Sequence, residues 1–275
     1  MIQVRALSVS LGHRQILHDV SFSAAPGALT AVIGPNGSGK STLMKAICRD
    51  IAYDGDVSIN GNNLSQMTPM QAATLRAVLP QSSSLPFPFT VYEVVSMGMT
   101  AGRSGVPQST SRRLPAMALD AVDLGGFGGR YYGEISGGEQ QRVQLARVLC
   151  QVWTPVLDNA PRYLFLDEPV SSLDVKHQLM IMDVARRYAD AGGGVIAILH
   201  DLNLAAMYAD SILALRDGRV AGFGTPQQVL TDGLITDVFD CPLRVGATPA
   251  AHMPFVLPQS AGRASMADHL IKVAS

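Results

Sequence analysis

The sequence of 275 residues has little of what several classes of protein require. Its three cysteines, Cys48, Cys150 and Cys241, are far apart and odd in number, which argues against a disulfide framework or a zinc site and fits a reducing compartment. No run of about 20 apolar residues lacks glycine, charged or polar breaks, so no transmembrane helix is expected. Lys and Arg number 21 against 22 for Asp and Glu, and this lack of a basic excess predicts no nucleic-acid partner.

The remaining composition is that of a folded protein. Hydrophobic residues make up 47% of the chain and charged residues only 16%, which excludes an intrinsically disordered chain. The length suits one large α/β domain with an inserted subdomain. The first residues, Met1 to Arg5, alternate like a strand and do not follow the signal-peptide pattern, so we expect the chain to fold in the cytosol.

Short apolar runs alternate with helical patterns along most of the chain. Buried strands are predicted at Leu29–Ile33, Tyr163–Leu166 and Val195–Leu199, and helices at Lys40–Arg49 and Val175–Ala191. The strand–helix–strand order indicates a parallel sheet with right-handed crossovers. Further strands are expected over Ile2–Ser23, at Asp56–Ile59 and in a hairpin around Asp217-Gly218.

Two stretches differ from this α/β pattern. Residues from about 86 to 150 contain proline-rich and glycine-rich loops and the helical patterns Val91–Met99 and Arg113–Val122, which predicts a mostly helical insertion. The last stretch, residues 242–275, is rich in proline, alanine and glycine, and we expect it to be loosely ordered with a short helix at Ala267–Val273. The main domain is therefore expected to span residues 1–241.

A glycine-rich loop follows the first buried strand and opens a helix. It matches G-x-x-x-x-G-K-[ST], in which glycines let backbone N–H groups curl around phosphate oxygens at a helix N-terminus. The lysine supplies a charge for the β- and γ-phosphates, and the hydroxyl after it can bind Mg²⁺. The residues expected to bind a nucleotide here are Gly34, Pro35, Asn36, Gly37, Ser38, Gly39, Lys40, Ser41 and Thr42.

Two acids end the strand Tyr163–Leu166, at the sheet edge where ligands bind in doubly wound folds. Asp167 is predicted to hold Mg²⁺, and Glu168 to orient or deprotonate an attacking water. The alternative is a pair of acids at a solvated strand end. The phosphate loop favours the catalytic interpretation.

A second candidate anion site is the run Ser136-Gly137-Gly138-Glu139 before a helical pattern at Glu139–Val152. Alone, this run is equally typical of an ordinary capped helix. With Ile135 before it, however, it resembles the LSGGQ signature of ABC-transporter ATPases, with Ile135 in place of Leu and Glu139 in place of Gln. The resemblance runs from about Ile2 to Leu230.

This resemblance implies an α/β P-loop NTPase fold: a RecA-like parallel-sheet core, an N-terminal antiparallel β subdomain and an inserted α-helical subdomain. It implies ATP hydrolysis with Mg²⁺ held by Ser41, Gln81 and Asp167. Gln81 resembles the Q-loop glutamine, Ser171–Asp174 the D-loop, and His200 the switch histidine that contacts the γ-phosphate. Lys40, Glu168 and His200 are the expected catalytic residues.

The family works as a head-to-tail dimer, in which the signature of one chain closes over the ATP held by the other. The resemblance therefore implies that Ser136, Gly137, Gly138 and Glu139 complete the site of a second copy. One departure concerns the base: the family usually has an aromatic residue near Leu11–His13 that stacks on adenine. Leu11 or His13 is expected to substitute for it, which leaves discrimination between ATP and GTP open.

Cargo is suggested by less specific segments. Leu199–Ala205 and Gly224–Leu230 resemble the iron-siderophore, heme and cobalamin importer group, and the long link at residues 151–162 and Phe255–Pro258 resemble its heme branch. The link is alternatively a tolerated surface loop. The resemblance implies a peripheral ATPase on the cytoplasmic face of a bacterial inner membrane. Its partners would be two permease subunits and, through them, a periplasmic binding protein, with no direct binding of heme. Siderophore or cobalamin import, or a soluble iron–sulfur cluster assembly ATPase, remain alternatives.

Overall fold

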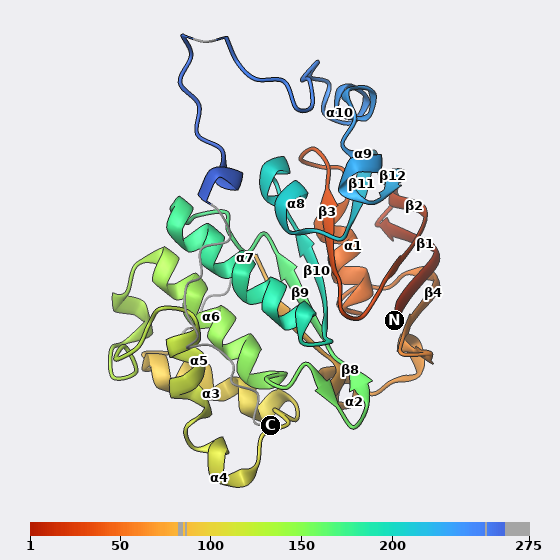
Figure 1. The fold of residues 1–275 in the computed structure, drawn as a ribbon. Helices are drawn as coiled ribbons and strands as arrows, with labels where there is room; N and C mark the ends of the chain where they lie inside the picture. Colours follow the sequence, from red (N-terminus) through yellow and green to blue (C-terminus); the bar gives the residue numbers. More distant parts are fainter. Residues whose placement is uncertain (82–84, 86, 251, 262–275) are drawn as a thin grey trace.

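The structure is a computed structural model that describes residues 1–81, 85, 87–250 and 252–261. Its centre is a six-stranded sheet in the order β12-β11-β3-β10-β9-β6 (Figure 1). All neighbours in this sheet are parallel except β12, which pairs antiparallel with β11. The strands are β3 (Leu29–Ile33), β6 (Arg76–Leu79), β9 (Tyr163–Asp167), β10 (Gly194–Ile198), β11 (Ser211–Arg216) and β12 (Arg219–Gly224).

The central strands are almost entirely apolar, with Thr30 and Asp167 as exceptions, because both of their faces are covered. Every residue of β3, β9 and β10 is buried. Leu164 and Leu166 face the core that contains helices α6 (Gly137–Gln151) and α7 (Val175–Asp190). Their neighbours Tyr163 and Phe165 face the core that contains α1 (Lys40–Ile47). The predicted parallel α/β core is confirmed.

The second sheet has four strands in the order β2-β1-β4-β5, and all of its pairs are antiparallel. Its strands are β1 (Ile2–Leu11), β2 (Arg14–Ala24), β4 (Asp54–Ile59) and β5 (Asn62–Asn63). Alternate residues of β1, such as Ile2 and Val4, share one core with α1. The expected antiparallel β subdomain is present, and Figure 1 shows it beside α1 on the right of the molecule.

A group of helices lies on the opposite side of the central sheet (Figure 1). Helices α3 (Val91–Ala101) and α5 (Leu114–Ala121) both pack on α6, and short α4 (Gln108–Ser111) lies near them. At Gly98 a Cβ would collide with the carbonyl of Arg147, so only glycine lets α3 approach α6 this closely. Helix α6 begins at Gly137, two residues before the predicted start, because Ser136 is its N-cap.

The long link at residues 151–162 contains structure that the sequence analysis does not predict. Strands β7 (Val156–Leu157) and β8 (Ala160–Pro161) form a two-stranded hairpin. Behind it, fully buried Arg162 donates to the carbonyls of Arg103, Ser104 and Thr154. Burial lowers the pKa of this arginine to about 10. The link is therefore fixed to the loop after α3.

The remaining helices connect or follow the sheet strands. They are α2 (Pro69–Leu75), α8 (Leu202–Tyr208), α9 (Pro226–Val229) and α10 (Asp232–Phe239), with 3-10 turns η1 (Leu64–Gln66), η2 (Tyr132–Glu134) and η3 (Pro258–Ala261). After residue 241 the chain returns to α8, where Gln259 donates to the carbonyl of Asn203. The predicted helix Ala267–Val273 lies outside the described residues. The division of the chain at residue 241 stays a prediction.

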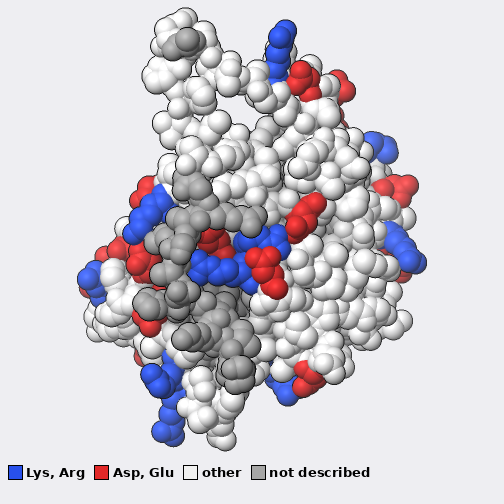
Figure 2. Space-filling model, in the orientation of Figure 1, with Lys and Arg blue, Asp and Glu red and all other residues white. Residues whose placement is uncertain are grey.

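Three properties expected from composition can be examined in the described part. No helix there is long and apolar enough to cross a membrane. All three cysteines are free, and burial raises the pKa of Cys48 and Cys150 to about 12, so neither thiol is reactive. On the face in Figure 2, basic and acidic side chains are interspersed and no continuous basic stripe is visible.

Candidate nucleotide-binding site

The phosphate loop, Gly34–Ser41, joins the end of β3 to the start of α1. Gly34, Gly37 and Gly39 have φ values of 149°, 80° and 102°, which L side chains rarely adopt. Gly39 is the N-cap of α1, so the amide groups of the first turn of that helix face the loop. The loop thus has the inward-facing N–H groups of an anion cradle.

Within the phosphate loop Gly34 is the glycine with the strictest requirement, since a Cβ there would overlap the Leu215 carbonyl and lie 2.7 Å from Ser38 Oγ. We expect Gly34→Ala to displace the loop, to destabilise the fold by about 2 kcal/mol or more and to weaken nucleotide binding. Gly27→Ala is the matched control, because Gly27 also has a positive φ of 75° but open space around its Cβ position. Thermal melting and nucleotide titration compare the two. Equal melting temperatures with intact affinity would contradict this expectation.

Lys40 lies over its own loop. Its Nζ donates to the carbonyls of Gly34 and Pro35, each at 2.9 Å, and only 5% of the residue is exposed. Burial lowers the pKa of Lys40, while the carboxylates of Glu168 and Asp167 act in the opposite direction. A cation held this way needs only to exchange carbonyl contacts for phosphate oxygens.

Asp167, the last residue of β9, is buried beside this lysine. Its Oδ1 has no hydrogen-bond partner, and burial followed by the charge of Glu168 raises its pKa. A buried carboxylate oxygen without a partner is a position that a cation stabilises. No cluster of three or more His, Cys, Asp and Glu side chains suited to a metal occurs in the part of the chain that the structure describes. The oxygens of Asp167, Ser41 and Gln81 fit Mg²⁺, which usually takes few protein ligands together with phosphates.

The Glu168 carboxylate contacts two other residues that the sequence predicts for the site, His200 and Gln81. Its Oε1 lies 2.7 Å from His200 Nε2, and its Oε2 accepts a hydrogen bond of 2.9 Å from Gln81 Nε2. The side chain of Glu168 is 13% exposed, whereas that of His200 is 43% exposed. The backbone of Glu168 has a φ of 51°, an uncommon conformation for a residue other than glycine. The structure therefore holds one carboxylate in a fixed position between an amide and an imidazole.

An open cleft of about 350 Å³ runs along the phosphate loop. Glu168 lines it together with residues of the loop and of α1, namely Asn36, Gly37, Gly39, Lys40, Ser41 and Thr42. Two further lining residues, Arg14 and Ile16 at the start of β2, were missed by the sequence analysis. Leu11 and His13, the residues expected beside the base, are not among the lining residues. No local motif marks Arg14, because its place in the cleft depends on how β2 packs on the loop.

The signature residues lie elsewhere. Ser136 donates to Glu139 Oε2 at 2.7 Å, and the Glu139 amide donates back to Ser136 Oγ at 3.3 Å, which forms a capping box. These hydrogen bonds lower the pKa of Glu139. None of Ser136, Gly137, Gly138 and Glu139 lines the cleft of the same chain. Glu139 therefore acts here as the acid of the helix cap, and it engages the Ser136 hydroxyl.

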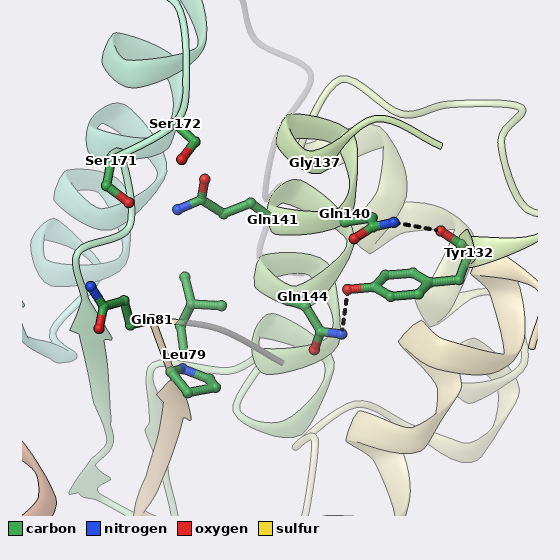
Figure 3. A pocket seen from close by; sticks show the side chains of 10 residues that line it. Leu79, Gln81, Tyr132, Gly137, Gln140, Gln141, Gln144, Ser171 and Ser172 are labelled. Atoms are coloured by element: carbon green, nitrogen blue, oxygen red, sulfur yellow. Dashed lines mark hydrogen bonds between the residues drawn. The ribbon is translucent and has the colours of Figure 1, made fainter. Parts of the chain in front are cut away.

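A second cavity, of about 200 Å³, separates the signature helix from the sheet edge (Figure 3). Gln81, Gln141 and Ser171 lie around it, and Gly137 is the signature residue in its lining. Gln141 of α6 donates to the Glu168 backbone carbonyl at 3.2 Å. On the far side, Gln144 donates to the Tyr132 hydroxyl at 3.0 Å. The helical group thus contacts the Glu168 segment directly.

Comparison with known proteins decides the family. Residues 17–171, more than half of the chain, match the family model described as ABC transporter. The chain belongs to the ABC transporter family. Curated ABC relatives include the hemin import ATP-binding protein HmuV of Mesorhizobium japonicum, 60% identical over 94% of this chain and 99% of that protein. Another is HmuV of a Chelativorans species, 56% identical over 95% and 99%.

Solved ABC structures agree in fold. The structure of an ATP-binding subunit of an ABC transporter is 27% identical, with a TM-score of 0.73 over 90% of this chain and 95% of that chain. The expected fold class, an ABC ATPase domain, is confirmed, and so is the family inferred from the motifs. The chain is an ABC ATPase, and members of this family bind ATP.

Proposed function

We propose that this ABC ATPase energises the import of hemin. Support for the cargo comes from the relatives, since those that carry the name of hemin import ATP-binding protein are 50–60% identical and cover nearly the whole chain. Support for the chemistry comes from Glu168, which is fixed between His200 and Gln81 at the cleft of the phosphate loop. In this proposal the chain binds no hemin itself and acts from the cytoplasmic face of the inner membrane.

The reaction uses groups that are already in position. The loop amides and Lys40 bind the phosphates and stabilise the charge that develops on the transferred phosphoryl group. Ser41, Gln81 and Asp167 would hold Mg²⁺, which supplies further charge neutralisation at the β- and γ-phosphates. Glu168 orients the attacking water and accepts its proton, and His200 contacts the γ-phosphate and fixes the carboxylate.

A second copy of the chain completes the site. The signature residues Ser136, Gly137 and Gly138 are absent from the lining of their own chain's cleft but lie at a helix start suited to an anion. A head-to-tail pair would place them over the ATP of the other copy, with two equivalent sites. ATP then stabilises the closed dimer, and hydrolysis lets it reopen.

The helical group would transmit closure to the two permease subunits. Exposed aromatic side chains, Phe87, Tyr92 and Tyr131, surround the start of α3. The backbone links this region together, since Thr90 bridges to Tyr131 and the Tyr132 amide donates to the Phe89 carbonyl. We infer that the segment from Gln81 to Phe89 carries the motion; residues 82–84 and 86 of this segment lie outside the described residues. Movement of Gln81 with Glu168 is the proposed start of the coupling.

Reconstitution tests the cargo and the partners. The chain, co-expressed with a candidate hemin permease, is expected to co-purify with it in detergent. In proteoliposomes the complex should drive ATP-dependent uptake of hemin delivered by a periplasmic binding protein. The same vesicles with Glu168→Gln should take up none. Uptake of a ferric siderophore or cobalamin instead would replace the cargo assignment. A chain that hydrolyses ATP but never associates with a membrane subunit would favour the soluble assembly ATPase.

A further inference from the structure

One wall of the nucleotide cleft consists of two side chains that no motif assigns. Apart from the phosphate loop, the start of α1 and Glu168, the lining residues are Arg14 and Ile16. The loop takes the phosphates, and Glu168 marks the terminal phosphate that water attacks. Arg14 and Ile16 are therefore the lining residues left for the nucleoside at the other end of the triphosphate.

This wall is held firmly against the loop. The His18 amide donates to the Gly218 carbonyl at 2.9 Å, and the Gly218 amide donates to the Ser38 carbonyl at 3.1 Å. A Cβ at Gly218 would collide with the Ile16 carbonyl, and one at Gly39 would lie 2.6 Å from Leu17 Cδ2. The start of β2, the β11–β12 turn and the phosphate loop are thus in direct contact, which fixes the backbone at Ile16 beside the loop.

The chemistry of the wall suits the face of a base rather than its edge. No aromatic side chain lines the cleft in the described part of the protein. Arg14 is exposed, and within the described residues no hydrogen bond or ion pair engages its guanidinium. A planar guanidinium stacks on aromatic rings, and an aliphatic chain such as that of half-buried Ile16 packs against a ring or a ribose. Stacking tolerates any base, because every base has a π-face.

We propose that Arg14 holds the nucleobase by stacking its guanidinium on the purine ring, with Ile16 packed beside it, and that the site consequently accepts GTP nearly as well as ATP. This inference rests on the proposed function, since it requires the cleft to bind a nucleoside triphosphate. Beyond the loop and Glu168, the wall offers only a guanidinium and an aliphatic chain. A stacked guanidinium does not distinguish the edges of adenine and guanine.

Equilibrium titrations of the full-length protein with ATP, GTP and inorganic tripolyphosphate test the role of Arg14. Wild-type protein should bind ATP and GTP within about threefold of each other. Arg14→Ala should weaken both by about 3- to 10-fold, the range of an exposed cation–π contact, and leave tripolyphosphate binding within about twofold. Arg14→Tyr should restore nucleotide affinity, whereas Arg14→Lys, which keeps the charge but not the planar group, should not. Arg113→Ala, an exposed arginine on the helical group, is the control for loss of charge.

Three results would overturn the inference. Equal weakening of ATP and tripolyphosphate by Arg14→Ala, with rescue by lysine, would make Arg14 a phosphate-binding charge. A preference of more than tenfold for ATP over GTP in the wild type would require a group that reads the base edge. Wild-type protein that binds neither nucleotide nor tripolyphosphate would refute the proposed function and this inference with it. The wild-type titrations alone identify that outcome, so it is distinct from a failure of the Arg14 inference.

Discussion

Glu168→Gln is expected to lower the ATP hydrolysis rate by about 10²- to 10⁴-fold while ATP affinity stays within about threefold of the wild type. The amide keeps the size of the side chain and one oxygen that can accept from Gln81 or from His200 Nε2. It cannot take a proton from water, and that is the step assigned to the carboxylate. Because Glu168 also presents a negative charge to the incoming phosphates, its neutralisation should not weaken nucleotide binding.

Two measurements check this expectation. Phosphate release gives the rate, and size-exclusion chromatography with ATP should show a stable dimer for the variant and mainly monomer for the wild type. Asp237→Asn is the matched carboxylate-to-amide control, since Asp237 is exposed on α10, away from the cleft. Turnover close to that of the wild type would remove Glu168 from its catalytic role, and a variant that binds no ATP would make it a binding residue instead.

The fold was predictable from sequence where the local residue pattern directly reflects the burial or backbone conformation of the segment in the folded chain. The buried strands Leu29–Ile33 and Tyr163–Asp167 each have a single polar exception, Thr30 and Asp167, because both faces of a parallel strand are covered. The Asp217-Gly218 turn identifies its hairpin through a conformation that few other residue pairs adopt. The β7–β8 hairpin was not predicted, because its strands have two residues each and Arg162, buried among backbone carbonyls, fixes the segment.

The candidate site likewise has a part that a local motif predicts and a part that depends on tertiary contacts. Its phosphate loop is a contiguous motif whose glycines and lysine act on a ligand within a few residues of each other, so spacing alone identifies it. The contact of Glu168 with Gln81 joins residues 87 positions apart, and only the resemblance to a family suggested that they meet. Arg14 belongs to the cleft through the packing of β2 on Gly39 and Gly218, a tertiary contact that leaves no pattern in the sequence around Arg14.

The second large effect is expected from Lys40→Ala, which should weaken ATP binding by about 10- to 150-fold, the equivalent of one lost hydrogen bond to a charged group. Lys40 Nζ is held by the carbonyls of Gly34 and Pro35, so the structure positions a cation at the loop. Without it, those carbonyls face the phosphates directly, and the amides alone must offset the repulsion.

Lys45→Ala separates this specific contact from general charge. Lys45 is exposed on the same helix and does not line the cleft, although its charge reaches Asp167. We expect this control to change the ATP Kd by less than about twofold, because exposed charges are screened by solvent and salt. Calorimetric titration of both variants gives the comparison. An unchanged Kd for Lys40→Ala would mean that backbone amides hold the triphosphate unaided. Equal losses of affinity in both variants would mean that Lys40 acts only through the overall positive charge of the helix and not through a specific contact.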